Sequence, residues 1–105
     1  MIFSPDCHYC REETKSLIEN MDKLKDVEIL MTTFEPLQAM TAYYKEFNLQ
    51  QYANIKMGRD TRYFFPPFYN IKKIPFIALY DEKGQLLTTF QTNVTITTLL
   101  QSFKL

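Results

Sequence analysis

The stretch Met1-Ile2-Phe3-Ser4-Pro5-Asp6-Cys7-His8-Tyr9-Cys10 decides how this chain is interpreted. A short apolar run leads into Cys7 and Cys10, which are the only two cysteines in the chain, and a helical pattern follows directly. Two thiols at this spacing on the first turn of a helix can close a small disulfide ring, and the positive end of the helix favours the thiolate form of the first thiol. The stretch therefore predicts dithiol–disulfide exchange, with Cys7 as the nucleophile and Cys10 as the resolving thiol.

Length and composition indicate one globular domain. The chain has 105 residues, of which 46% are hydrophobic, so we expect a single domain over residues 1–105 with its own core. The formal net charge is zero, which gives no support for a nucleic-acid partner. No apolar run has the length of a membrane span, so we expect no membrane insertion by this chain.

Hydrophobic spacing predicts alternating strands and helices. Apolar residues recur at helical spacing in three segments, and dense apolar runs mark the strands. In chain order, we predict a strand over 1–4, a helix over 7–24, a strand over 27–31, a helix over 36–47, strands over 75–80 and 86–90, and a helix over 96–103. This β-α-β-α-β-β-α order predicts an α/β fold with a central mixed four-stranded sheet and flanking helices.

The remaining residues give weaker signals. Residues 53–56 are expected to form a short extended segment. The aromatic stretch over 64–69 is interrupted by two prolines, so no regular element is expected there. Its aromatic side chains fit either a partner surface or core packing, and packing is the more common role.

Two stretches resemble the thioredoxin superfamily. Residues 3–13 carry the Cys-x-x-Cys pair between a strand and a helix, and residues 69–84 carry Ile74-Pro75 before a strand and an Asp-x-x-Gly turn. More narrowly, the chain resembles the TlpA-like thiol–disulfide oxidoreductases, close to the AhpC/TSA-type redoxins. The likeness covers nearly the whole chain and implies a thioredoxin-like fold without the extra N-terminal strand of full-length thioredoxins.

The resemblance also assigns roles to individual residues. It implies a cis bond at Pro75, which would place the backbone of Ile74 beside Cys7 for pairing with an extended substrate. Glu13 matches a glutamate that tunes the thiols or relays protons in TlpA-like proteins. The alternative for Glu13 is an ordinary carboxylate on the helix surface. Asp6 stands where this superfamily often has Trp.

The two residues between the cysteines have open roles. His8 is the only histidine, and its cation would stabilise a neighbouring thiolate; it is equally an exposed spacer. Tyr9 either shields Cys10, contacts a partner or is a similar spacer. A zinc site is not expected, because Cys7, His8 and Cys10 provide too few suitably placed ligands.

We therefore expect an enzyme that exchanges disulfides with protein substrates, in the reductase direction. No flavin or nicotinamide motif is present, so no cofactor is expected and electrons would come from another dithiol protein. The alternative is a redox-inactive thioredoxin-like module that binds proteins. A thiol peroxidase is disfavoured, because Pro5 and Cys7 do not supply the Pro-x-x-x-Thr/Ser-x-x-Cys pattern of peroxiredoxins.

The resemblance implies a location in the bacterial periplasm or cell envelope, with the cytoplasm as the alternative. Two cysteines in one redox motif suit either compartment. The opening residues already have the pattern of a core strand, which leaves open that the chain is a fragment of a longer exported protein.

Overall fold

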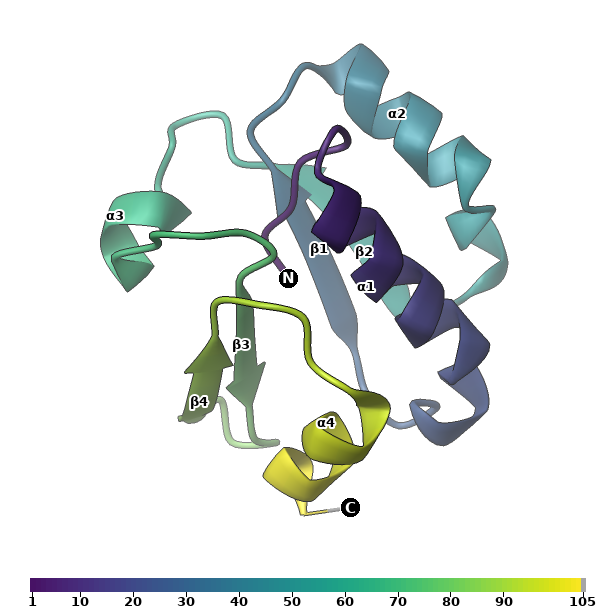
Figure 1. Ribbon diagram of the computed structural model, residues 1–105, viewed down its shortest axis with the longest axis vertical. Helices are drawn as coiled ribbons and strands as arrows, with labels where there is room; N and C mark the ends of the chain where they lie inside the picture. Colours follow the sequence, from purple (N-terminus) through teal and green to yellow (C-terminus); the bar gives the residue numbers. More distant parts are fainter. Residues whose placement is uncertain (105) are drawn as a thin grey trace.

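Two pairs of strands lie at the centre of an α/β fold, with helices packed around them (Figure 1). The computed structural model describes residues 1–104. The elements are, in chain order, α1 (His8–Glu19), the 3₁₀ helix η1 (Met21–Lys23), β1 (Ile29–Thr33), α2 (Leu37–Glu46), the 3₁₀ helix η2 (Leu49–Gln51), β2 (Ile55–Arg59), α3 (Phe65–Tyr69), β3 (Ile77–Tyr80), β4 (Leu86–Phe90) and α4 (Ile96–Phe103). No helix among the described residues is both long and apolar enough to cross a membrane.

The strands form two small sheets. β1 and β2 are parallel, and β3 and β4 are antiparallel. The first residues of the chain lie between the pairs, where Ile2 forms isolated bridges to Thr32 and to Phe76. The predicted central four-stranded sheet is therefore not found in this form. The segment at residues 1–4 makes too few backbone contacts to count as a strand, so the two pairs remain separate sheets.

The first predicted helix is too long. We expected it over 7–24, whereas α1 ends at Glu19 and η1 follows after Asn20. The side-chain amide of Asn20 donates a hydrogen bond to the carbonyl oxygen of Ser16 at 2.8 Å. Asparagine side chains that bond to nearby backbone in this way compete with the helical pattern, which accounts for the early end.

β2 and α3 differ from the sequence-based expectation for different reasons. β2 extends beyond the predicted segment because it pairs with β1 along its whole length, a contact between distant residues. α3 forms in a stretch wrongly predicted to be irregular. The Asp60 carboxylate accepts hydrogen bonds from the backbone N–H groups of Phe64 and Phe65 at 2.8 and 2.9 Å. Both prolines lie in the first turn, where a helix needs no backbone donor.

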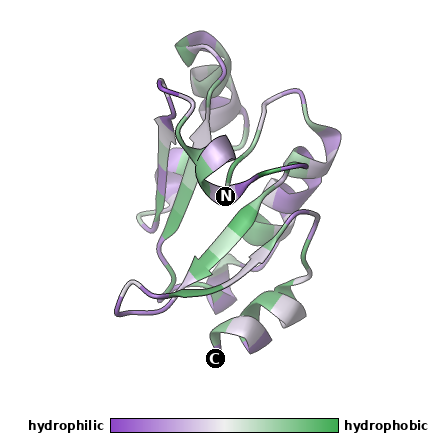
Figure 2. Ribbon diagram, turned by 90° about the vertical axis from the view of Figure 1, so that its left-hand side faces the viewer, coloured by the Kyte–Doolittle hydropathy of each residue, from purple (hydrophilic) through white to green (hydrophobic). Residues whose placement is uncertain are grey.

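The core consists of two apolar clusters, and α1 contributes to both. The first lies between α1, α2 and the parallel strands and contains Phe3, Cys10, Met31, Tyr43, Leu49 and Ile55. The second lies beside the antiparallel pair and α4 and contains Leu17, Leu24, Ile77, Leu79, Val94 and Leu99. Figure 2 shows apolar stretches along the strands and more polar loops around them. Because α1 is anchored at both ends of its buried face, the position of its first turn is fixed.

Candidate functional site

Cys7 occupies the N-cap position of α1. Its backbone is extended, with φ −84° and ψ 114°, and its N–H donates to the carbonyl oxygen of Ser4 at 3.0 Å. Its sulfur accepts a hydrogen bond from the backbone N–H of Cys10 at 3.1 Å. The sulfur therefore caps the positive end of the helix, where unpaired N–H groups and the helix dipole favour negative charge.

The two cysteines are free thiols in different environments. Cys7 is half-buried, whereas Cys10 is fully buried in the first apolar cluster. Burial raises the pKa of the Cys10 thiol to about 12, and the neighbouring Cys7 sulfur adds to the increase. Cys10 is therefore protonated at neutral pH, and Cys7 is the more exposed of the two thiols.

Ile74 and Pro75 lie beside this pair. The Ile74 carbonyl oxygen is 4.0 Å from the Cys7 sulfur, at the long limit for a hydrogen bond to sulfur. The peptide bond between Ile74 and Pro75 is cis, and Pro75 is fully buried. The structure therefore brings together Cys7, Cys10 and the loop that enters β3, although these segments are far apart in the sequence.

Gln91 holds the same loop from the other side. Its side-chain oxygen accepts hydrogen bonds from the backbone N–H groups of Lys72 and Lys73, at 2.6 and 3.2 Å. These residues directly precede Ile74. Sequence reasoning missed Gln91, because a single glutamine after a strand carries no motif that signals such a contact.

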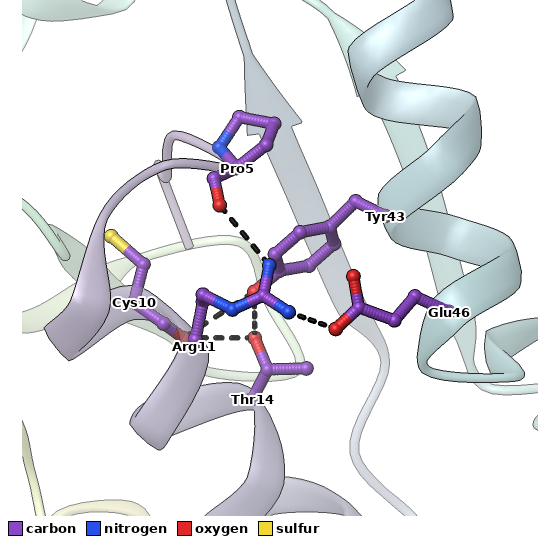
Figure 3. Close-up of polar contacts among 6 residues, drawn as sticks. All are labelled: Pro5, Cys10, Arg11, Thr14, Tyr43 and Glu46. Carbon is purple, nitrogen blue, oxygen red and sulfur yellow. Dashed lines mark hydrogen bonds and ion pairs between the residues drawn. The ribbon is translucent and has the colours of Figure 1, made fainter.

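Two hydroxyl groups surround the carbonyl oxygen of Cys10 (Figure 3). Thr14 donates to this oxygen at 3.0 Å, and the Tyr43 phenol lies 3.4 Å from it and 2.6 Å from the Thr14 hydroxyl. Tyr43 and Thr14 are both buried, and burial raises the pKa of Tyr43 to about 12. This network connects Cys10 to α2, and the hydroxyl oxygens of both Thr14 and Tyr43 are hydrogen-bonded in it.

Arg11 joins the loop before Cys7 to α2. Its guanidinium donates to the Pro5 carbonyl oxygen at 3.2 Å and forms an ion pair with Glu46 (Figure 3). It also lies over the rings of Tyr43 and Phe47, 5.5 and 5.1 Å from their centroids. Such stacking suits arginine, whose planar cation is attracted to aromatic faces. The available sequence signal was the four-residue spacing of Tyr43, on α2, and Phe47, at the C-cap of α2.

Glu13 is buried, so the alternative of a carboxylate on the helix surface is wrong. Only 2% of Glu13 is exposed, and burial raises the pKa of its carboxyl group. One carboxyl oxygen accepts hydrogen bonds from the backbone of Val94 at 2.9 Å and from the Asn93 amide at 3.1 Å. The other has no partner among the described residues. The carboxyl group contacts the loop between β4 and α4 and makes no hydrogen bond to either thiol in residues 1–104.

Asn93 connects this loop to the cysteine turn. Its side-chain amide donates to the carbonyl oxygen of Tyr9 at 2.8 Å, as well as to Glu13. Glu13 is therefore linked through Asn93 to the turn between the two cysteines. Asn93 was also missed from the sequence.

His8 and Tyr9 are exposed at the start of α1. His8 pairs with Glu12 at 2.8 Å, and 61% of Tyr9 is exposed. The two rings are 5.6 Å apart in an edge-on arrangement. Neither side chain hydrogen-bonds a cysteine sulfur in the part of the chain that the structure describes. No group of three or more His, Cys, Asp or Glu side chains there is placed to hold a metal ion.

The aromatic stretch around α3 is only partly packed. Phe64 and Phe68 are 55% and 61% exposed, and their rings stack on each other at 5.1 Å. Tyr69 instead packs on Phe76 at 5.0 Å and shares a hydrogen bond with the Tyr80 hydroxyl. The side of α3 that carries Tyr69 is therefore packed against the core, whereas the side that carries Phe68 is exposed.

Two comparisons with known proteins give no relative whose site could be compared with this one. A scan against models of protein families finds no match to this chain, and a search of curated proteins finds no similar sequence. Function is therefore inferred from the residues around Cys7 and Cys10.

Proposed function

We propose that this protein is a thiol–disulfide oxidoreductase that exchanges the Cys7–Cys10 dithiol with disulfides in protein substrates, working as a reductase. The observation that carries the proposal is the contrast between the two thiols. A half-buried Cys7 sulfur caps α1 next to a fully buried Cys10 and beside Ile74. This is the arrangement that a two-step exchange requires: one reachable nucleophile and one shielded resolving thiol.

In the first step, the Cys7 thiolate attacks one sulfur of a substrate disulfide. The substrate S–S bond breaks, a new S–S bond joins Cys7 to the substrate, and the other substrate sulfur leaves as a thiolate. The backbone N–H of Cys10, which donates to the Cys7 sulfur at 3.1 Å, is placed to stabilise the attacking charge.

In the second step, Cys10 resolves the mixed disulfide. It gives up its proton and attacks the Cys7 sulfur, so the bond to the substrate breaks and an intramolecular disulfide forms. Its proton goes to the departing substrate thiolate, and two electrons have passed from the protein to the substrate. The raised pKa of Cys10 supports this order, because a protonated thiol does not compete with Cys7 for the first attack.

Ile74 is the proposed contact for the substrate backbone. Its carbonyl oxygen lies 4.0 Å from the Cys7 sulfur, so a substrate segment paired with it would carry its own sulfur close to Cys7. Pairing of an extended segment with an exposed backbone edge is a common way to bind peptides. Gln91 supports the role by holding the residues that precede Ile74.

The fold and the cellular location that we propose are based on the sequence resemblance. A thioredoxin-like arrangement is supported by a cysteine pair that follows the bridge at Ile2 and stands at the start of α1, and by Ile74-Pro75 before β3. A separate dithiol protein would return the protein to its reduced form, with no cofactor. The bacterial cell envelope is the proposed location, on the resemblance to TlpA-like proteins alone.

Reduction of a model protein disulfide tests the proposal. We expect the reduced protein to convert the substrate disulfide to thiols and to end as a Cys7–Cys10 disulfide, with two substrate thiols released for each oxidised pair. The matched control is Cys7→Ser, which keeps the size of the side chain and removes the nucleophile. Binding of the substrate without loss of its disulfide would instead support the alternative of a redox-inactive binding module.

A further inference from the structure

The loop between β4 and α4 contacts the cysteine site at two points. It comprises residues 91–95, shown in yellow-green in Figure 1, and we refer to it as the clamp loop. Gln91 and Asn93 make the two contacts through their side chains. Thr92 lies between them, is exposed, and makes no side-chain hydrogen bond within residues 1–104. The two contacts therefore come from positions two residues apart on one short segment.

The first contact fixes the loop that enters β3. The side-chain oxygen of Gln91 accepts hydrogen bonds from the backbone N–H groups of Lys72 and Lys73, at 2.6 and 3.2 Å, so both residues directly before Ile74 are held. Two N–H donors require an acceptor, so the oxygen of Gln91, and not its amide nitrogen, makes this contact. A carboxylate oxygen at position 91 would satisfy the same two donors.

The second contact fixes the turn between the two cysteines. The side-chain nitrogen of Asn93 donates to the carbonyl oxygen of Tyr9 at 2.8 Å and to the carboxyl group of Glu13 at 3.1 Å. A carbonyl oxygen can only accept, so position 93 must supply a donor. A carboxylate at position 93 could not replace the amide in this contact. The chemical requirements at positions 91 and 93 are therefore opposite.

The clamp loop is itself fixed at both ends. At its near end, it follows directly from β4. At its far end, Val94 is buried and its N–H donates to the carboxyl group of Glu13 at 2.9 Å. Thr95 is the N-cap of α4, and its hydroxyl oxygen accepts from the N–H of Thr98 at 3.2 Å. The loop therefore connects two ordered elements and can hold its two contacts at a fixed separation.

Few other contacts join the two halves of the site. Within residues 1–104, the one hydrogen bond between residues 7–10 and residues 72–74 is the contact of 4.0 Å between the Cys7 sulfur and the Ile74 carbonyl oxygen. At that length it is too weak to hold the two halves together. The clamp loop supplies three shorter hydrogen bonds, of 2.6 to 3.2 Å. The separation of Cys7 from Ile74 therefore depends on the clamp loop, as well as on the backbone bridge of Ile2.

We propose that Gln91 and Asn93 are positioning residues for disulfide exchange, which hold the substrate-binding backbone of Ile74 and the cysteine turn at the separation that the reaction requires. This inference rests on the proposed function. Gln91 pre-organises the backbone edge with which a peptide pairs, so it governs the affinity for peptide substrates. Asn93 pre-organises the turn between the cysteines, so it governs closure of the Cys7–Cys10 disulfide.

Two disulfides of different size test the role of Gln91. The first is acetyl-Thr-Val-Cys-Val-Thr-amide joined through its cysteine to nitrothiobenzoate, and its β-branched residues favour an extended backbone. The second is dithiobis(nitrobenzoate), which has no peptide backbone to pair with Ile74. Attack by Cys7 on either compound breaks its S–S bond and releases coloured nitrothiobenzoate. Single-turnover rates of the reduced protein are measured at increasing concentrations of each compound.

Gln91→Ala should raise the peptide concentration needed for half of the maximal rate by about tenfold, with the maximal rate itself changed by less than about twofold. Its rate with dithiobis(nitrobenzoate) should be unchanged, because no backbone pairing is involved. Gln91→Glu should restore the unaltered behaviour, since its carboxylate accepts from the same two N–H groups. Thr92→Ala is the matched control and should behave like the unaltered protein with both compounds.

Equilibration with glutathione tests the role of Asn93. The equilibrium constant for forming the Cys7–Cys10 disulfide measures how well the turn brings the two sulfurs together, and Asn93→Ala should lower it by about fivefold or more. Asn93→Asp should lower it at least as far, because a carboxylate cannot donate to the Tyr9 carbonyl oxygen. Replacement of amide by carboxyl is thus tolerated at position 91 and not at position 93, a contrast that a general loss of stability would not produce.

Equal losses with the two disulfides in Gln91→Ala, or no loss with either, would overturn the role of Gln91. An unchanged glutathione equilibrium in both Asn93 variants would do the same for Asn93. A different result would count against the proposed function itself: if the unaltered protein released nitrothiobenzoate from both compounds no faster than a model thiol does, disulfide exchange would be wrong and this inference would fail with it.

Discussion

The short segment Met1–Phe3 has two very different surroundings at its two ends. At its carboxyl end, the chain passes into the Cys7 turn, where the hydroxyls of Thr14 and Tyr43 and the guanidinium of Arg11 bond to backbone carbonyl groups. At its amino end, Met1 and Ile2 line a cavity whose lining also includes the acidic residues Asp26, Glu28, Asp81 and Glu82. The same segment therefore leads into the ordered cysteine turn at one end and borders a cavity at the other.

The difference shows what each region needs. Side chains from α1 and α2 hold the cysteine turn in place. The only strand contacts that it needs in addition are the two bridges of Ile2, to Thr32 and to Phe76. The two strand pairs, in contrast, are connected within residues 1–104 only by the isolated bridges of Ile2 to Thr32 and Phe76. We therefore expect changes near Cys7 to affect chemistry or core stability strongly, and changes at exposed positions to have small effects.

The largest effect is expected from Cys7, the proposed nucleophile. Cys7→Ser should lower the rate of substrate disulfide reduction by about a thousandfold or more, because an alcohol cannot replace the thiolate at neutral pH. The rate is measured by release of substrate thiols. Cys10→Ser is the informative partner variant: it should still attack and should accumulate the mixed disulfide with substrate. Residual turnover in Cys7→Ser close to that of the unaltered protein would contradict the assignment.

Tyr43 tests the packing at the cysteine end. Tyr43→Ala should lower the free energy of unfolding by about 3–5 kcal/mol, because the buried ring packs between Phe3 and Phe47. Tyr43→Phe keeps the ring and removes the hydroxyl, so a loss of about 1 kcal/mol is expected. Urea unfolding measures both. Equal losses in the two variants would mean that the hydrogen bonds, and not the ring, hold α2 to the site.

The buried carboxyl group of Glu13 is expected to make the free energy of unfolding depend on pH. Its pKa is raised from 4.5 in the folded state, so the folded chain keeps this proton after the unfolded chain has lost it. The stability associated with the protonated carboxyl group is therefore complete below pH 4.5 and declines as pH rises through the folded-state pKa. Glu13→Gln should remove this part of the decline. The measurement is the free energy of unfolding of both proteins from acid to neutral pH; identical slopes would contradict the prediction.

The smallest effect is expected at His8. Its ion pair with Glu12 is exposed, so His8→Ala should change the free energy of unfolding by no more than about 0.5 kcal/mol. Thermal or urea unfolding with Glu12→Ala as a matched variant measures this. A loss several times larger in His8→Ala alone would show that the side chain has structural contacts beyond its ion pair.

Local signals predicted the parts of the fold that depend on neighbours in sequence. The start of α1 at the cysteine pair follows from a cap residue before a helical pattern, and the β3–β4 hairpin follows from Gly84, whose φ of 78° suits the turn. The α/β class was also confirmed, with one parallel and one antiparallel pair of strands.

Contacts between distant residues could not be predicted in the same way. β2 depends on β1, the first turn of α3 depends on Asp60, and the burial of Glu13 depends on the loop at Val94. A carboxylate next to Glu12 on a helix gives no sign in the sequence of which of the two is buried. The split of the central sheet has the same origin, since pairing over three residues cannot be distinguished from a full strand by hydrophobicity alone.

A redox titration of the Cys7–Cys10 pair tests the central claim most directly. The protein would be equilibrated with glutathione buffers of different ratio, trapped by alkylation and analysed by mass. We predict a single two-electron transition between a form with both thiols alkylated and a form with neither, and no lasting glutathione adduct. Two thiols that alkylate independently at every ratio, without an intramolecular disulfide, would contradict the account.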